Sequence, residues 1–345
     1  MSKETALLKS MFSFTKTPLI CSAPMLGTTG PDLITAVYKS GGLGFLGAGF
    51  DLTNLSANLA HTHSLLPDIT PLPIGIGVIL FRADLSLFLS SLKSHPPVAV
   101  WFFAPETAEQ LDTWIINTKS HYPQIKIFVQ LGSVKELKAL LAGPAGEGID
   151  VIVAQGVADS GGHGLCRGAS VVGLVPEFRN VIRESGRVIP VLAAGGIVDG
   201  CGAAAALALG ASGVVMGTRF ILTPECAAAD GFKEYLLNLS DGGQNTTRTR
   251  IFDTLRGTGF WPQQYNGRGA MNGTLRDDES GMAESENREL YEKALASGDW
   301  ERLTMFCGTG VGSIQDLQPA GEVVVSVRDG AVKALWEAAQ EFAGL

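Results

Sequence analysis

The strongest constraint on the fold is a regular alternation of short apolar segments with longer amphipathic ones over the first two thirds of the chain. The apolar segments resemble parallel strands buried on both faces, and they lie at 19–25, 43–49, 73–80, 98–104, 126–132, 150–156, 188–196 and 213–220. Helical patterns separate them, for example at 31–40, 107–120, 134–141 and 202–209. Eight such units in a row favour an α/β fold of the closed (β/α)8 TIM barrel type, with an open doubly wound sheet as the alternative.

The alternation stops after Phe220. A segment rich in Gly, Asn, Arg and Thr follows at about 241–281, and helical patterns return at 284–297 and 330–342. We therefore predict a barrel formed by residues 1–224 plus about 321–345. Residues from about 225 to 320 are expected to form an added C-terminal substrate or lid lobe over one end of that barrel.

Composition narrows the class of partners. Of the 345 residues, 46% are hydrophobic, which is enough for the large core of a barrel. The formal net charge of −8 leaves no basic stripe for phosphates or anionic lipids, so we expect neither nucleic acid nor a membrane as a partner. The N-terminus lacks a signal-peptide pattern, and no run approaches the roughly 18 apolar residues of a membrane span. We predict a cytoplasmic protein, with import into an organelle left open.

The cysteines and paired histidines predict no metal site. The five cysteines are odd in number and never form a CxxC pair, which argues against a disulfide framework or a zinc site and suits a reducing compartment. His61 and His63 lie two residues apart in a helical pattern, so their side chains face different directions.

The most informative strand end is the segment 151–164. Because ligands of barrel enzymes lie over the C-terminal ends of the strands, Gln155 and the following loop with Gly161, Gly162 and His163 are expected to face a ligand. An imidazole has a near-neutral intrinsic pKa, so His163 is our candidate catalytic base or anion contact. The alternative is a structural histidine.

Two neighbouring strand ends predict a phosphate site. One ends in Ala194, Gly195 and Gly196, and the next ends in Met216, Gly217 and Thr218. Barrels commonly bind phosphate with the loops after strands seven and eight, where glycines let backbone N–H groups reach the oxygens. Two tight turns without a ligand are the alternative.

Other strand ends offer contacts to a flat ring. Ala23, Pro24 and Met25 follow the first strand and combine an apolar wall with backbone donors and acceptors, as a flavin ring requires. The alternative interpretation of Met25 is that its side chain is part of the hydrophobic core. Gln130, at the end of the fifth strand, is expected to reach the same ring.

The segment 247–272 combines arginines with aromatic residues, namely Arg248, Arg250, Arg256, Arg268, Phe260, Trp261 and Tyr265. Local arginines attract anionic substrates and aromatic side chains close apolar pockets. The alternative is a set of ion pairs that fastens the lobe to the barrel. We assign no catalytic role to this segment.

With these residues in view, the chain resembles the nitronate monooxygenase family, formerly called 2-nitropropane dioxygenases, and especially its fungal-type members. The matching motifs are APM at 23–25, AQG at 154–156, GGHG at 161–164, AAGGI at 193–197, MGTRF at 216–220 and RTRIFDTLRG at 248–257. They extend over most of the chain.

The resemblance implies non-covalent FMN in a barrel with a substrate domain. It further implies oxidation of alkyl nitronates by molecular oxygen to a carbonyl compound and nitrite, through one-electron transfer to the flavin. The family histidine that matches His163 acts as a base on neutral nitroalkanes, where these are accepted, and as a contact for nitronates. The expected partners are thus a small-molecule nitronate and oxygen, with an oligomer possible. One departure is that four residues, VADS, separate Gly156 from Gly161, where the family usually has two or three. The loop is thus about one residue longer, which is expected to displace His163 or alter the pocket above the flavin.

Three alternative functions stay open. An NAD(P)H-dependent flavin reductase, of the enoyl-acyl-carrier-protein or quinone reductase type, shares the GGH and AAGGI elements. A phosphate-binding barrel of the inosine-monophosphate dehydrogenase type needs a nucleophilic cysteine, for which Cys166 is the candidate. A non-catalytic flavin-binding protein is the third.

Overall fold

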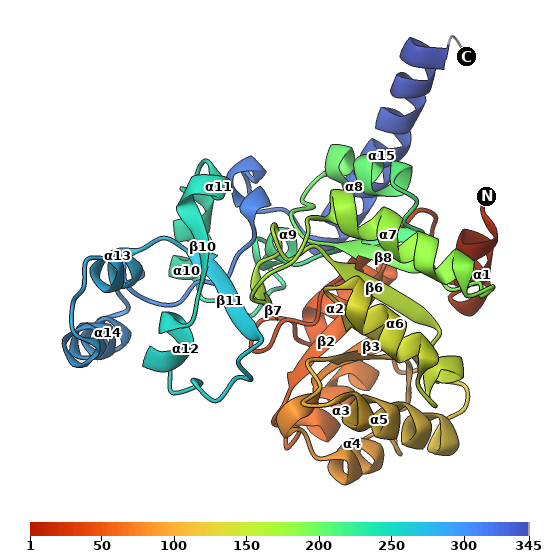
Figure 1. Cartoon of the computed structure of the whole chain (residues 1–345), viewed down its shortest axis with the longest axis horizontal. Coiled ribbons are helices and arrows are strands. Elements are labelled where there is room, and N and C mark those ends of the chain that lie inside the picture. Colours follow the sequence, from red (N-terminus) through yellow and green to blue (C-terminus); the bar gives the residue numbers. More distant parts are fainter. Residues whose placement is uncertain (344–345) are drawn as a thin grey trace.

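The computed structural model describes residues 1–343 and contains a closed barrel of parallel strands (Figure 1). The barrel strands in spatial order are β1 (Leu19–Ser22), β2 (Leu43–Gly49), β3 (Leu72–Ile79), β4 (Pro97–Phe103), β5 (Lys126–Leu131), β6 (Val151–Gln155), β8 (Val191–Ala194) and β9 (Gly213–Met216). The barrel closes because β9 pairs in parallel with β1, with Ile20 opposite Val214. The predicted TIM barrel is confirmed, and the open sheet is wrong.

Helices cover the outside of the barrel. They are α2 (Pro31–Lys39), α3 (Leu55–Leu65), α4 (Leu85–Ser91), α5 (Ala108–His121), α6 (Val134–Ala142), α7 (Val171–Glu184), α8 (Gly200–Ala208), α9 (Thr218–Ile221) and α15 (Ala320–Ala343), with short 3-10 turns at Leu80–Arg82 and Gly146–Gly148. Side-chain caps start several of them as the sequence suggests: Thr107, Ser133 and Asp199 accept hydrogen bonds from backbone N–H groups of α5, α6 and α8.

The core has two layers, as strands buried on both faces require. Between the strands and the helices, apolar side chains form one large cluster. A second cluster fills the barrel interior and includes Phe45, Trp101 and Phe128. The N-terminal helix α1 (Lys3–Met11) and the residue after it add Leu8 and Phe12 to the interior cluster. The barrel is therefore a packed core that leaves space for a ligand only at its rim.

Three predicted strands extend too far, each for a local reason. The first ends at Ser22, because the chain then turns and Thr29 donates a backbone hydrogen bond to Met25. The strand predicted at 188–196 ends at Ala194, because Gly195 and Gly196 have positive φ angles of 127° and 71°. The last ends at Met216, because the following residues form α9.

A second, smaller sheet was not predicted. It consists of β10 (Thr246–Thr249), β11 (Tyr265–Ala270) and β7 (Gly162–Leu165), in this order and antiparallel. His163 lies in β7 opposite Gly267, so the segment we expected as a glycine-rich loop is a strand. The sequence GGHG has few strand-forming residues, and its partner lies about 100 residues further along the chain, so no local pattern indicates the pairing.

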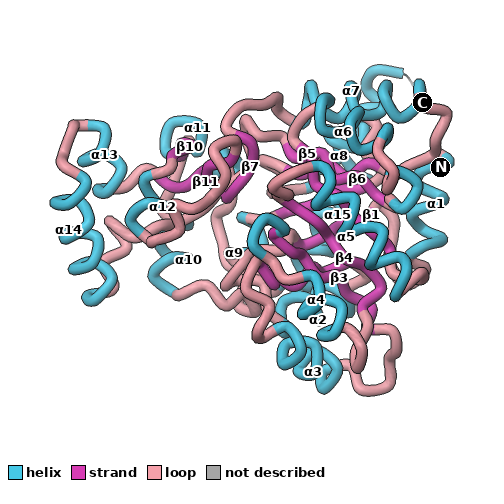
Figure 2. Tube along the Cα trace, turned by 60° about the horizontal axis from the view of Figure 1, so that its bottom comes forward, coloured by secondary structure: helices cyan, strands magenta, loops and turns pink. Residues whose placement is uncertain are grey.

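The remaining helices lie with this sheet on one side of the barrel, while both termini lie on the far side (Figures 1 and 2). They are α10 (Asp230–Leu237), α11 (Gly242–Asn245), α12 (Ile251–Leu255), α13 (Gly273–Glu279) and α14 (Glu284–Ser297), followed by a 3-10 turn at Thr309–Ser313. The helix predicted at 284–297 is α14, and the one predicted at 330–342 is the second half of α15, which packs against α8 and α2. Below, "lobe" means residues 225–319; its treatment as a separate substrate unit stays a proposal.

No helix within residues 1–343 is both long and apolar enough to cross a membrane.

Arg248 and Arg268 of the lobe bond to carbonyl and hydroxyl oxygens of the barrel and form no ion pair within residues 1–343, whereas Arg219 of the barrel pairs with the carboxylate of Asp316 in the lobe at 3.2 Å. The guanidinium of Arg248 donates to the carbonyl of Val157 at 2.9 Å, to Oγ of Ser160 at 2.9 Å and to the carbonyl of Asn266 at 2.9 Å. Arg268 donates to the carbonyl of Ala158 at 2.9 Å. Burial lowers the pKa of Arg248 to about 10, and the nearby Arg268 contributes to this shift.

Replacing Arg248 with Met is expected to lower the free energy of unfolding by about 2 to 3 kcal/mol, because several buried acceptors lose their donor at once. Chemical denaturation measures this loss. The control is Arg183→Met, whose guanidinium lies on the exposed face of α7 and, within the described residues, bonds only to Asn180. Equal unfolding midpoints for the two variants would contradict a fastening role for Arg248.

Candidate active site

A cavity of about 440 Å³ lies at the C-terminal ends of the barrel strands and is closed by lobe residues on its other side. This volume lies within the range of about 300 to 1,000 Å³ that small-molecule sites have. All residues predicted from the sequence line it except Met216, namely Ala23, Pro24, Met25, Gln130, Gln155, Gly161, Gly162, His163, Ala194, Gly195, Gly196, Gly217 and Thr218. Met216 is buried in the layer between the strands and the helices, and only its carbonyl, which accepts from Ala23, contacts the segment at the rim.

The floor of the cavity depends on glycines that the sequence analysis did not single out. Pro24 lies directly on Gly77 of β3, where an added Cβ would come within 2.1 Å of the proline Cβ. Met25 lies in the same way against Gly47 of β2, where an added Cβ would be 2.3 Å from the methionine carbonyl oxygen. Only glycine at these two strand positions allows the segment 23–25 to lie flat across the barrel rim and present an apolar surface.

At one end of the cavity, the main chain of three glycine-containing segments lines the wall. Gly195 and Gly196 have φ angles that favour glycine, and Gly217 and Thr218 adjoin them after β9. The lobe adds a third segment at Gly308, whose N–H is used in a hydrogen bond to Oγ1 of Thr218 at 3.0 Å and so positions that hydroxyl.

Gly310 belongs to this same lobe segment, and an added Cβ there would lie 2.4 Å from the carbonyl oxygen of Gly196. Gly308 and Gly310 were not predicted as site residues, although the spacing GTG at 308–310 is a signal for close backbone approach. The donor set at this end of the cavity fits a phosphate group.

Two glutamines line the inner part of the cavity. Oε1 of Gln130 accepts a hydrogen bond from Nε1 of Trp101 at 3.0 Å, which fixes the orientation of the amide. Nε2 of Gln155 donates to the carbonyl of His163 at 2.9 Å. Gln155 therefore holds β7 over the barrel and so contributes to the position of the histidine.

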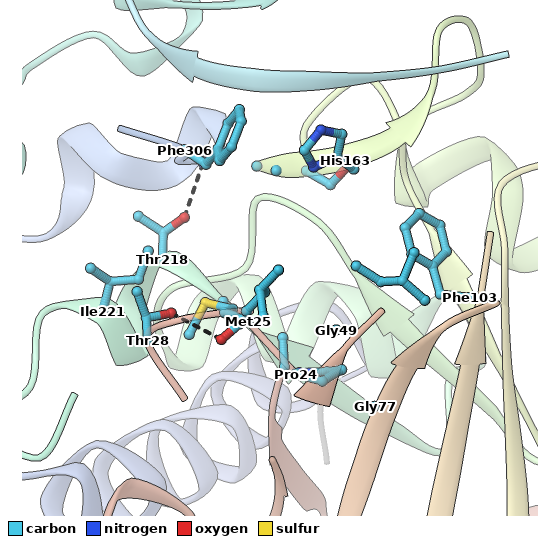
Figure 3. Close-up of a pocket in the computed structure, with 18 of the residues that line it drawn as sticks. Pro24, Met25, Thr28, Gly49, Gly77, Phe103, His163, Thr218, Ile221 and Phe306 are labelled. Carbon is cyan, nitrogen blue, oxygen red and sulfur yellow. Dashed lines mark hydrogen bonds between the residues drawn. The ribbon is translucent and has the colours of Figure 1, made fainter. Parts of the chain in front are cut away.

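His163 faces the cavity from the side opposite Pro24 and Met25 (Figure 3). Its Nε2 lies 3.0 Å from both carboxylate oxygens of Asp253. Its ring stacks on Trp261, with 3.8 Å between the ring centroids and 6° between the planes. Phe306 contacts the ring by its edge at a centroid distance of 5.0 Å. The imidazole is thus held in one plane and in one rotation.

The hydrogen bond to Asp253 determines which ring nitrogen of His163 is available to a ligand. Asp253 is only 2% exposed and accepts a further hydrogen bond from Oγ1 of Thr258 at 2.9 Å. A carboxylate only accepts hydrogen bonds, so Nε2 of His163 carries the proton. Nδ1 has no hydrogen-bond partner within residues 1–343, and its lone pair is left for a ligand.

Asp253 and Thr258 were not predicted as site residues from the sequence. Asp253 lies in the motif RTRIFDTLRG, so a signal was present. Its role was hidden because 90 residues separate it from His163 and only the pairing of β7 with the lobe sheet brings the two together. Trp261 was expected to close an apolar pocket, and it does so by covering the imidazole.

The longer loop before His163 turns tightly on itself. The N–H groups of Asp159 and Ser160 both donate to the carbonyl of Gly156, and Thr309 of the lobe donates to the carbonyl of Asp159 at 3.0 Å. The four residues between Gly156 and Gly161 are thus accommodated in a turn that the lobe fastens, and His163 follows in the cavity wall.

No cysteine thiol is placed to act as a nucleophile in this cavity. Cys166 lies beyond the end of β7, where its thiol donates to the carbonyl of Gln263, and it does not line the cavity. Cys307 is buried close to Gly161, and burial raises the pKa of its thiol to about 12. A mechanism of the inosine-monophosphate dehydrogenase type therefore lacks its essential group here.

Comparison with known proteins agrees with these features. Residues 92–329 match the sequence model of the family described as nitronate monooxygenase. The chain is 40% identical over 341 residues to the nitronate monooxygenase npaC of Metarhizium robertsii, which covers 94% of this chain and 93% of that protein. The chain belongs to the nitronate monooxygenase family. The resemblance drawn from the sequence motifs is confirmed.

Further relatives extend the comparison. The nitronate monooxygenase of Neurospora crassa is 37% identical over 357 residues, covering 95% of this chain and 93% of that one. Among solved structures, the nitroalkane oxidase of Streptomyces ansochromogenes superimposes with a TM-score of 0.74 at 25% identity, over 95% of this chain and 99% of that chain. FabK from Thermotoga maritima, at a TM-score of 0.73 and 24% identity over 98% of both chains, shares the fold.

Proposed function

We propose that this member of the nitronate monooxygenase family is an FMN-dependent enzyme that oxidises alkyl nitronates with molecular oxygen. In the reaction the C–N bond breaks, the carbon gains an oxygen atom to become a carbonyl, and nitrite leaves. The observation that carries the proposal is His163, whose Nε2 is fixed by Asp253 and whose Nδ1 is free at the wall of a glycine-lined cavity.

The residues of the cavity fit FMN. The bare backbone at Gly195, Gly196 and Gly217 and the hydroxyl of Thr218 would hold its phosphate, and the flat apolar surface of residues 23–25 would support its ring. When bound, the flavin supplies the electron-accepting centre for the oxidation. We further propose that the lobe acts as the substrate unit and that the protein works in the cytoplasm.

His163 would handle the proton and the anionic group of the substrate. With a neutral nitroalkane, Nδ1 accepts the proton from the carbon next to the nitro group, which leaves a delocalised nitronate anion. The imidazolium so formed is stabilised by the buried carboxylate of Asp253 at 3.0 Å. With a nitronate as substrate, protonated His163 donates from Nδ1 to its negative oxygen.

An absorbance spectrum of the purified protein, followed by oxygen uptake and nitrite release with ethyl and propyl nitronates, tests this function. We expect a flavin spectrum, oxygen uptake with both nitronates, and anaerobic bleaching of the flavin by nitronate but not by NADH or NADPH. A colourless protein that FMN cannot reconstitute would refute the cofactor. Bleaching by NADH or NADPH alone would indicate a reductase, and bound FMN without turnover of any substrate would indicate a binding protein.

Replacing Asp253 with Asn is expected to lower kcat with a neutral nitroalkane by about 10- to 100-fold, because the uncharged amide no longer stabilises the imidazolium. Turnover of the preformed nitronate is expected to fall less, since that substrate needs no proton removal. Steady-state oxygen uptake with nitroethane and ethyl nitronate measures the ratio. The exposed Asp278→Asn serves as control. A parallel fall for both substrates, with partial loss of flavin, would reduce Asp253 to a structural role.

A further inference from the structure

The cavity continues past His163 along the lobe. Its wall there is formed by side chains from α10, α14 and the segment 300–306, namely Phe232, Tyr291, Leu295, Trp300, Leu303 and Phe306. We call this part the apolar arm. It is built in one piece with the site already described, since both belong to the same cavity.

The indole ring of Trp300 is held in place in the wall of the apolar arm by its packing against α10. Its ring stacks on Phe232 at a centroid distance of 5.7 Å and an interplanar angle of 15°. An added Cβ at Gly231 would lie 2.2 Å from the indole ring, so only glycine there lets α10 approach so closely. At the outer end, Leu295 is 65% exposed although it lines the cavity. An exposed leucine at the rim of an apolar channel is suited to contact an apolar group that enters it.

The hydroxyl groups of the arm are already paired. The hydroxyl groups of Tyr291 and Thr304 bond to each other at 2.9 Å, so they do not require a polar group from a ligand. The charged side chains that line the cavity within residues 1–343 are Asp253 and Arg256, and both lie at the His163 end. Apart from the indole N–H of Trp300, which has no hydrogen-bond partner within residues 1–343, the side chains of the arm offer only apolar contact.

Arg256 marks the boundary between the two parts of the cavity. It follows Asp253 by three residues, and its guanidinium lies over the ring of Phe306 at 5.5 Å. The guanidinium forms no ion pair or hydrogen bond with another residue of the part of the chain that the structure describes. Arg256 and His163 both contact the ring of Phe306, and Arg256 is exposed at the edge of the cavity. A cation at this place, next to an apolar arm, matches a ligand with an anionic head and an apolar tail.

We propose that the preferred substrate of this site is a nitronate with an extended apolar substituent, an alkyl chain of several carbons or an aryl group, which occupies the apolar arm. This inference rests on the proposed function and adds the substrate class to it. Burying one CH₂ group contributes about 0.8 kcal/mol. We therefore expect kcat/KM to rise about fourfold for each methylene added from ethyl nitronate onward, until the chain passes Leu295.

The test compares ethyl, butyl, hexyl and octyl nitronates with wild type, Leu295→Ser and Arg256→Gln. Because Leu295 is exposed, Leu295→Ser is expected to fold, and the hexyl-to-ethyl ratio of kcat/KM is expected to fall at least about threefold. Arg256→Gln is expected to lower kcat/KM about tenfold at every chain length and leave the ratio unchanged. Leu317→Ser, an exposed leucine outside the cavity, is the matched control.

A binding measurement separates this inference from the proposed function. Under anaerobic conditions, quenching of tryptophan fluorescence by nitroethane, 1-nitrobutane and 1-nitrohexane reports occupancy of the cavity next to Trp101, Trp261 and Trp300 without oxygen-dependent turnover. Affinity that rises with chain length and loses its slope in Leu295→Ser supports the apolar arm even if no nitronate is oxidised. Affinities and kcat/KM values that do not depend on chain length would overturn it, even if ethyl nitronate is a good substrate.

Discussion

His163→Asn is expected to lower turnover of neutral nitroalkanes by about 10² to 10⁴-fold while FMN stays bound. The asparagine amide is shorter than the imidazole and has no group that accepts a proton at neutral pH, so the carbon acid keeps its proton. The flavin is expected to remain because its proposed contacts lie on the barrel side of the cavity, at residues 23–25 and at the glycines after β8 and β9. Oxygen uptake with nitroethane, together with the flavin absorbance of the same sample, measures both quantities.

The substitution leaves the Asp253 carboxylate buried with only Thr258 as a side-chain donor. The double variant His163→Asn/Asp253→Asn removes that unpaired charge and distinguishes lost stability from lost catalysis. If it regains thermal stability but not turnover, the imidazole is the catalytic group. His121→Asn, on the exposed part of α5, controls for a general effect of histidine replacement. Unchanged nitroethane turnover in His163→Asn would remove His163 from the mechanism.

The barrel could be predicted from the sequence because each of its strands is buried on both faces. Burial on both faces gives continuous apolar runs, such as Val151–Gln155, that a local pattern identifies. The C-terminal ends of the strands were predicted less accurately. A strand ends where the backbone turns, as it does after Ser22, and hydrophobicity does not indicate that position. The predicted ligand contacts at strand ends followed from barrel geometry, which brings all C-terminal ends to one rim.

The wall of the cavity that β7 and the lobe form around His163 could not be predicted in the same way. Its geometry depends on β7, whose four residues Gly162–Leu165 have no strand pattern and pair with β11 far along the chain. That pairing brings Asp253 to His163 and Trp261 onto its ring. Long-range pairing of glycine-rich segments depends on shape and not on composition, so a reader of the sequence finds the histidine but not the residues that orient it.

The glycines under the floor are a second feature of this kind. Gly47 and Gly77 occur within apolar runs, where an isolated glycine is compatible with several structural roles. Only the structure shows that the reason is contact with the segment 23–25, which crosses the ends of β2 and β3. Because of this contact, a substitution at one of these glycines is expected to weaken cofactor binding although the glycine itself supports the floor from below.

Gly77→Ala is expected to weaken FMN binding about 5- to 150-fold, which corresponds to the roughly 1 to 3 kcal/mol that overpacking costs. The new methyl group would lie 2.1 Å from Cβ and 2.4 Å from Cγ of Pro24, so the proline has to move away from β3. Pro24 is part of the proposed support of the flavin ring, and its displacement changes the surface on which the ring lies. Flavin content after dialysis, and the Kd from titration of the apoprotein with FMN, measure the effect.

The matched control is Gly173→Ala in α7, where the new methyl group would meet only Cβ of Ala169 at an ordinary 3.5 Å. This variant is expected to bind FMN like wild type and to be slightly more stable, because alanine favours the helix over glycine. If Gly77→Ala and wild type have comparable thermal stability without added FMN, the loss of FMN affinity is due to a local change at the cavity floor. If Gly77→Ala instead retains FMN with an unchanged Kd, the ring does not rest on Pro24, and the orientation of the flavin between the floor and His163 has to be revised.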